Sequence, residues 1–87
     1  MAKDNITVER EKDLWKEGAI RIGKSIFHYD AKVYDLPSEF GIDGGRISKL
    51  SIKRKGEEVC SYDRGWDIKP VDEDTENALA ILMHSYE

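Results

Sequence analysis

The chain has 87 residues, of which 39% are hydrophobic and 37% charged, and its formal net charge is −4. This length allows one domain with a small core, and the composition is that of a globular rather than a disordered chain. A single cysteine, Cys60, excludes an internal disulfide, and no apolar run approaches the length of a membrane-spanning helix. We therefore expect a soluble cytoplasmic protein.

The N-terminal residues differ in composition from the rest of the chain. Residues 1–13 alternate polar and charged side chains, with Ile6 and Val8 as their main apolar content. Such a segment can bury little surface, so we expect a mobile N-terminal arm over residues 1–13. Residues 14–87 are expected to form a single α+β domain.

Two β-hairpins are predicted in the middle of the chain. The first spans residues 15–34 around the turn Gly23–Lys24, and the second spans residues 46–62 around the turn Lys55–Gly56. In the first hairpin, apolar side chains alternate with polar ones at Phe27, Tyr29, Ala31 and Val33. One apolar side per strand predicts an antiparallel sheet that is covered on one face.

The segment between the hairpins, residues 35–45, is rich in residues that break helices and strands. Its Gly44–Gly45 pair favours a sharp turn into the next strand. The alternative is an anion site built from the glycine N–H groups, but neither the Lys-Ser/Thr pattern nor the helix of a phosphate loop follows. The candidate binding positions of this loop are Glu39, Gly44, Gly45 and Arg46.

Residues 72–86 are predicted to form the C-terminal helix. Acidic residues at its start complement the positive end of the helix dipole, and Asp72 is placed to cap free N–H groups. One apolar stripe follows helical spacing through Leu79, Leu82, Met83 and Tyr86. The expected fold is therefore α+β: a four-stranded antiparallel sheet of two hairpins, with one C-terminal helix packed on one face.

The face of the sheet opposite the helix is expected to meet either water or a partner. Strand alternation assigns Ile26, Tyr34 and Ile47 to this outer side. Together they would form an exposed apolar patch, which would indicate an interaction surface.

The segment SYDRGWDIK, residues 61–69, joins the predicted sheet to the helix and holds the candidate binding residues Tyr62, Asp63, Arg64, Trp66 and Asp67. In a structural interpretation, Trp66 fills the end of the core and Arg64 pairs with nearby acids, Glu39 among them. In a functional interpretation, the aromatic and arginine side chains form an exposed anchor, because these residue types are enriched at binding hot spots.

No catalytic or metal-binding pattern is recognised. Asp63 and Asp67 are not fixed by a known acid–base motif, and His28 and His84 do not match the spacing of metal ligands. Cys60 as a nucleophile would need one of the histidines beside it. We expect no catalytic residue, no metal and no cofactor.

Three segments carry a resemblance: GIDGGRISKL, YDRGWD and the final ALAILMHSYE. They resemble a family of small uncharacterised single-domain proteins, encoded largely by phages, prophages and conjugative elements of Gram-positive bacteria. The similarity runs from about Trp15 to Tyr86. The family carries no established activity, so no site residue is transferred; the resemblance implies a small accessory or anti-defence protein of a mobile element.

We expect a non-enzymatic protein that binds an unidentified protein partner, as a monomer or weak homodimer and away from membranes. One alternative is a nucleotide or nucleic-acid binding module, with phosphate contacts and stacking rings chosen from Lys49, Lys53, Arg54, Arg64, Tyr62 and Trp66. Another is an inhibitor that imitates nucleic acid with its acidic helix, since residues 72–87 hold five acidic and no basic side chains.

Overall fold

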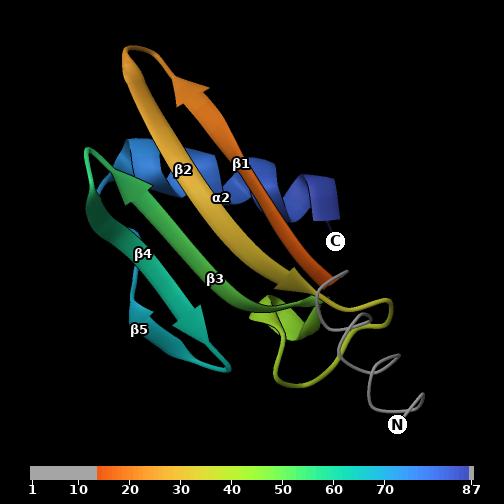
Figure 1. Cartoon of the computed structure of the whole chain (residues 1–87). Helices are drawn as coiled ribbons and strands as arrows, with labels where there is room; N and C mark the ends of the chain where they lie inside the picture. The colour runs from red at the N-terminus through yellow and green to blue at the C-terminus, as the bar shows by residue number, and fades with distance from the viewer. Residues whose placement is uncertain (1–13, 87) are drawn as a thin grey trace, which may run out of the picture.

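The computed structural model describes residues 14–86; the predicted arm over residues 1–13 lies outside the described residues, as does Glu87. The elements are β1 (Trp15–Ile22), β2 (Ser25–Val33), the 3₁₀ turn η1 (Ile42–Gly44), β3 (Ile47–Arg54), β4 (Glu57–Asp63), β5 (Trp66–Ile68) and α2 (Glu73–Tyr86). The strands form one antiparallel sheet in the order β1-β2-β3-β4-β5, and α2 crosses one of its faces (Figure 1). The predicted α+β class, with a single C-terminal helix on an antiparallel sheet, is confirmed.

The sheet has five strands, so the prediction of four is wrong. The predicted junction folds into a third hairpin, in which Tyr62 pairs with Trp66 and Ser61 pairs with Ile68. The chain reverses because Arg64 adopts a left-handed conformation with φ of 57°, and the Asp63 N–H donates to the Gly65 carbonyl at 2.9 Å. β5 has three residues, too few to show the alternation that identifies a strand from sequence.

Both predicted hairpin turns are confirmed. Gly23 has a φ of 59°, and in the second turn Lys55 and Gly56 have φ values of 54° and 79°. Positive φ at both central residues defines a type I′ turn, whose twist matches that of the flanking strands. The Lys55–Gly56 turn meets this definition, whereas in the first turn only Gly23 has positive φ. Both two-residue turns fix the register of the strands that they join.

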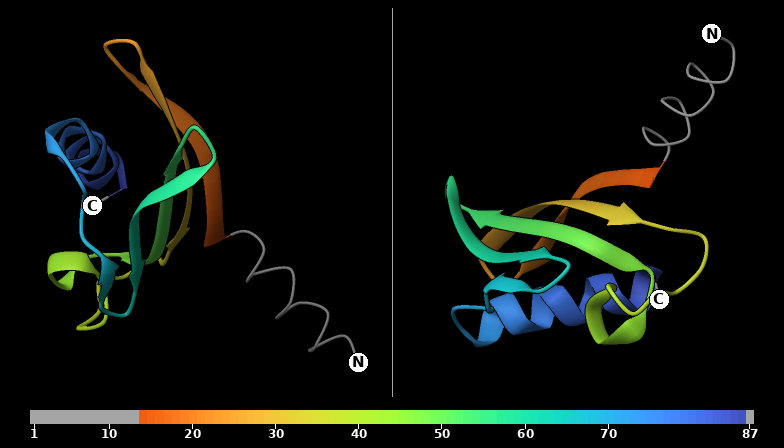
Figure 2. Two further views of the ribbon diagram at one scale, coloured as in Figure 1. Left: turned by 90° about the vertical axis from the view of Figure 1, so that its left-hand side faces the viewer. Right: turned by 90° about the horizontal axis from the view of Figure 1, so that it is seen from below.

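α2 lies over one face of the sheet (Figure 2), and buried side chains of the strands and of the helix form the core between them. Its largest fully buried side chains are Phe27, Ile42, Ile47, Ile52 and Leu82. On the helix, Thr75, Ala78 and Leu82 are buried, while Ile81 is 44% exposed. The apolar stripe predicted for the helix therefore packs on the sheet through Leu82, with Leu79, Met83 and Tyr86 partly buried beside it.

A β-bulge changes the side chains that face the core at the end of β2. Lys32 pairs with Lys49 and Val33 pairs with Ile47, so Ser48 has no partner in this register. The extra residue turns Ile47 inward, where it is fully buried. The expected outer patch is therefore wrong for Ile47, although Ile26 and Tyr34 are exposed as predicted.

Two polar contacts attach α2 to the sheet. Asp72 caps the helix by accepting the Thr75 N–H at 2.9 Å, and it also binds Arg54 of β3 at 2.7 Å. Hydrogen bonds from Arg54 and Thr75 lower the pKa of Asp72 to about 2. At the other end of the helix, the Tyr29 and Tyr86 hydroxyls lie 2.9 Å apart, and this hydrogen bond raises the pKa of Tyr29 to about 12.

Candidate functional site

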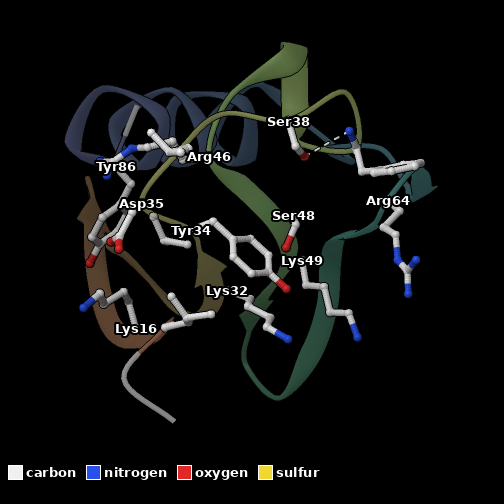
Figure 3. A pocket seen from close by; sticks show the side chains of 14 residues that line it. Lys16, Lys32, Tyr34, Asp35, Ser38, Arg46, Ser48, Lys49, Arg64 and Tyr86 are labelled. Atoms are coloured by element: carbon white, nitrogen blue, oxygen red, sulfur yellow. Dashed lines mark hydrogen bonds between the residues drawn. The ribbon is translucent and has the colours of Figure 1, made fainter. Parts of the chain in front are cut away.

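A groove of about 1270 Å³ opens where β2 ends and β3 begins, between the sheet and the loop of residues 34–46 (Figure 3). The charged side chains that line it are Lys16, Lys32, Arg46, Lys49 and Arg64, with Asp35. The lining therefore contains five cationic side chains and one carboxylate. Three of these cations, Lys16, Lys32 and Arg46, also interact with other groups of the chain. We call this surface the basic groove.

The bulge between β2 and β3 helps to build the basic groove. Lys32 and Lys49 are directly opposite each other on neighbouring strands, which places two ammonium groups side by side on the sheet. The Lys32 ammonium lies 5.4 Å from the centre of the Tyr34 ring. On its other side Lys49 is opposite Asp63 of β4, so a carboxylate also borders this pair of lysines.

The loop that closes the basic groove presents apolar side chains to solvent. Leu36 is 76% exposed, Phe40 50% and Tyr34 39%. The loop is nevertheless held by hydrogen bonds: the Tyr34 N–H donates to Arg46 O at 3.0 Å, and the Phe40 N–H donates to Ser38 Oγ at 3.2 Å. The exposed Tyr34 and Phe40 rings therefore project from a backbone that is held by hydrogen bonds.

The candidate glycines close this loop rather than bind an anion. The Gly44 N–H donates to the Gly41 carbonyl at 3.0 Å, and the Gly45 N–H donates to Ile42 at 2.9 Å. Gly41, which the sequence analysis did not single out, is more constrained, because a Cβ there would lie 2.0 Å from Gly45 O. Of the other loop candidates, Arg46 lines the basic groove, whereas Glu39 is exposed outside its lining.

The junction candidates separate into two groups. Tyr62 is 8% exposed, and its hydroxyl donates to the Phe40 carbonyl at 2.9 Å. Trp66 packs edge-on against the Tyr62 ring, with the ring centres 5.0 Å apart, and stays 37% exposed. These two aromatics therefore support the end of the sheet and the loop beside it.

Arg64 does not form the ion pairs that were expected of it. Within residues 14–86 it forms no ion pair with Asp63, Asp67 or Glu39, so that part of the structural interpretation is wrong. Its N–H donates to the Ser48 carbonyl at 3.1 Å, and its side chain lines the basic groove. Asp63 and Asp67 are exposed and lie outside the groove lining.

The cations proposed as phosphate contacts also separate. Lys49 and Arg64 line the basic groove, whereas Arg54 is bound to Asp72 and lies over the Phe27 ring. Lys53 is exposed outside the groove. The sequence analysis missed the groove side chains Lys16, Lys32 and Phe40. Strand alternation places the Lys32 side chain on the outer face of the sheet. The bulge that follows Lys32, which alternation does not reveal, lies where the strand meets the loop.

Other chemical features of the described part of the chain are limited. Cys60 is fully buried, and burial raises its pKa to about 11, so the thiol is neither accessible nor ionised near neutral pH. Residues 14–86 contain no group of three or more His, Cys, Asp or Glu side chains placed to hold a metal ion. None of the helices in this range is long and apolar enough to span a membrane.

Comparison with known proteins identifies the family. A family described as "Domain of unknown function (DUF7678)" matches residues 14–87, and the chain belongs to it. The match covers the whole sheet and the helix, including every residue of the basic groove. Searches among curated proteins and among solved structures gave no match.

Proposed function

We propose that this member of the DUF7678 family is a non-enzymatic binding module that holds single-stranded nucleic acid in the basic groove. The observation that carries the proposal is the placement of Lys49 and Arg64 side by side in the basic groove, near exposed rings. Phosphate neutralisation by lysine and arginine supplies much of the affinity of nucleic-acid-binding proteins. This arrangement favours the nucleic-acid alternative over the protein partner that the sequence alone favours.

The phosphate contacts are assigned to one side of the groove. In Figure 3, Lys32, Lys49 and Arg64 lie below and to the right of the Tyr34 ring, whereas Lys16 lies apart from them near Tyr86. Arg64 holds a left-handed backbone conformation, which is costly for a residue other than glycine and persists where the surrounding structure imposes it. Its N–H bond to Ser48 fixes it beside Lys49, so the two side chains are suited to successive phosphates of one strand.

The exposed rings favour a single strand over a duplex. Tyr34 lies in the middle of the groove in Figure 3, and Phe40 belongs to the same lining. Unpaired bases offer their faces for stacking on such rings, whereas a duplex keeps those faces covered. Because stacking tolerates every base, we expect binding with weak sequence preference.

The test is fluorescence anisotropy with a labelled single-stranded oligonucleotide at low salt. The double variant Lys49→Glu/Arg64→Glu should bind at least about tenfold more weakly, because two phosphate contacts become repulsive. The matched control, Lys24→Glu/Lys55→Glu, makes the same charge change at the two hairpin turns, at the opposite end of the sheet from the groove (Figure 1), and should lose much less affinity. Equal losses in both variants, or no binding by the unmodified chain, would contradict the proposal.

A protein partner is the second candidate, and Leu36 is the observation that favours it. An aliphatic side chain that is 76% exposed beside Phe40 and Tyr34 suits an apolar contact better than a phosphate backbone. The chain would then act in the cytoplasm as a small accessory protein of a phage or mobile element, as the resemblance implies. Affinity capture from host lysate should recover a partner that Leu36→Asp loses; capture unchanged by this substitution would exclude the loop as the contact.

A further inference from the structure

The edge strand β1 has a row of backbone N–H and C=O groups that do not pair with β2. β1 is eight residues long and lies at one end of the strand order, where it pairs with β2. Ile22 and Ser25 flank the two-residue turn, so they form the first hydrogen-bonded pair and the alternate residues Ile20 and Gly18 follow the same pattern. The N–H and C=O groups of Glu17, Ala19 and Arg21 consequently point away from β2 and can pair with another strand.

The outer side chains of β1 are complementary to a second copy of themselves. Glu17, Ala19 and Arg21 share the outer face because strand side chains alternate. If two β1 strands run antiparallel with Ala19 opposite Ala19, Glu17 of each copy is opposite Arg21 of the other. The contact then has two reciprocal ion pairs on either side of a small central pair, as two-fold symmetry requires.

The charges around Glu17 give a further reason for this pairing. Within the chain, the cross-strand partner of Glu17 is Asp30 on β2, so two carboxylates are directly opposite each other. Neither forms an ion pair within residues 14–86, and neither does Arg21. An arginine on the free side of Glu17 would reduce the repulsion between the carboxylates, and Arg21 of a second copy occupies that place in the register above.

We propose that the chain forms a homodimer by antiparallel pairing of β1 with β1 about Ala19, joining two five-stranded sheets into one. The symmetry axis is perpendicular to the sheet, so the two α2 helices lie on the same side of the joined sheet. This inference uses a surface other than the phosphate side of the basic groove, and it does not depend on nucleic-acid binding.

Charge reversal with rescue tests the pairing. Sedimentation equilibrium of the full chain should show a dimer, and Glu17→Arg or Arg21→Glu alone should weaken it by about tenfold or more, because each places like charges opposite each other twice. The double variant Glu17→Arg/Arg21→Glu restores opposite charges and should recover the dimer. A monomeric unmodified chain, or a double variant as weak as the single ones, would overturn the proposal.

A backbone test separates strand pairing from a general charge effect. Ala19→Pro removes an outward N–H while leaving the bonds of β1 to β2 in place, so it should abolish the dimer. Ala19→Ser keeps the N–H and serves as the matched control, which should still dimerise. Circular dichroism melting must show that both variants are folded. A folded Ala19→Pro variant that still dimerises would place the contact elsewhere and refute the pairing of β1 strands.

Discussion

The β4–β5 hairpin and the loop of residues 34–46 lie at the same end of the sheet but use their aromatic residues in opposite ways. The hairpin contains residue types that are typical of binding sites, yet Tyr62 is buried and Trp66 packs against it. The loop consists largely of turn-forming residues, yet Phe40 is 50% exposed. Tyr34, at 39%, is exposed to about the same extent as Trp66, at 37%, but its ring faces the Lys32 ammonium rather than another ring. The difference shows that the contacts a ring makes, rather than its residue type, decide whether it supports the fold or stays open to solvent.

The two regions are also physically connected. The Tyr62 hydroxyl donates to the carbonyl of Phe40, so the buried ring of one region holds the backbone that displays the exposed ring of the other. Arg64 is the exception within the hairpin, because its side chain joins the groove lining. We therefore propose that the hairpin supports the loop, and that the loop together with Arg64 forms the binding surface.

The largest effect is expected from a glycine that closes the loop. Gly41→Ala places a Cβ 2.0 Å from the Gly45 carbonyl oxygen, so the loop must open, and we expect a loss of about 3 kcal/mol in the free energy of unfolding together with loss of binding. Gly65→Ala in the hairpin is the matched control, since nothing lies within 4 Å of its added Cβ. Urea denaturation measures both variants. Equal destabilisation would remove the distinction between the two regions.

A smaller effect is expected from removing one aromatic ring in each of the two regions. Trp66→Ala should lower the free energy of unfolding by about 1 to 2 kcal/mol through loss of its contact with Tyr62, with a lesser effect on binding. Phe40→Ala should weaken oligonucleotide binding by about tenfold through loss of stacking, with melting almost unchanged. Thermal melting measures the stability of both variants, and fluorescence anisotropy measures their oligonucleotide binding. The reverse pattern would mean that Trp66 binds the ligand and Phe40 supports the fold.

The smallest effect concerns pH and the attachment of α2, which belongs to neither region. The pKa of Tyr29 is raised from its ordinary value of 10.0 to about 12, because Tyr86 hydrogen-bonds to its hydroxyl and burial disfavours the phenolate. The folded state therefore holds this proton more tightly than the unfolded state, so the stabilisation is complete below pH 10 and is lost as the pH rises toward 12. Urea denaturation across this range should show the decline, and Tyr86→Phe should reduce it. A decline of the same size in Tyr86→Phe would assign it to other groups.

Much of the fold could be predicted from local patterns, and the remainder depends on irregular backbone. Alternation and turn residues identified four strands, and acidic residues before an apolar stripe identified α2, because these signals lie within one element. β5 was missed because three residues carry no period, and Ile47 was assigned to the wrong face because one bulged residue reverses the alternation. Neither feature has a local sequence signal comparable to Lys55–Gly56.

The candidate site was predictable only in part for the same reason. Lys49, Arg64 and Arg46 were selected from their charge or their place beside a turn, and the structure brings them into one groove. Lys16, Lys32 and Phe40 come from three separate segments, and the pairing of β1 with β2 and the closed loop bring them to one groove. Charge identifies the residues that could line a groove, whereas the tertiary contacts decide which of them do.

The salt dependence of single-strand binding tests the central claim most directly. If groove cations neutralise about three phosphates, the logarithm of the association constant should fall against the logarithm of salt concentration with a slope of roughly −2. Replacing Arg64 with alanine should make the slope shallower by about 0.7, while Lys24→Ala at the far hairpin turn should leave it unchanged. A slope near zero, or the same slope in both variants, would show that the basic groove does not hold a phosphate backbone.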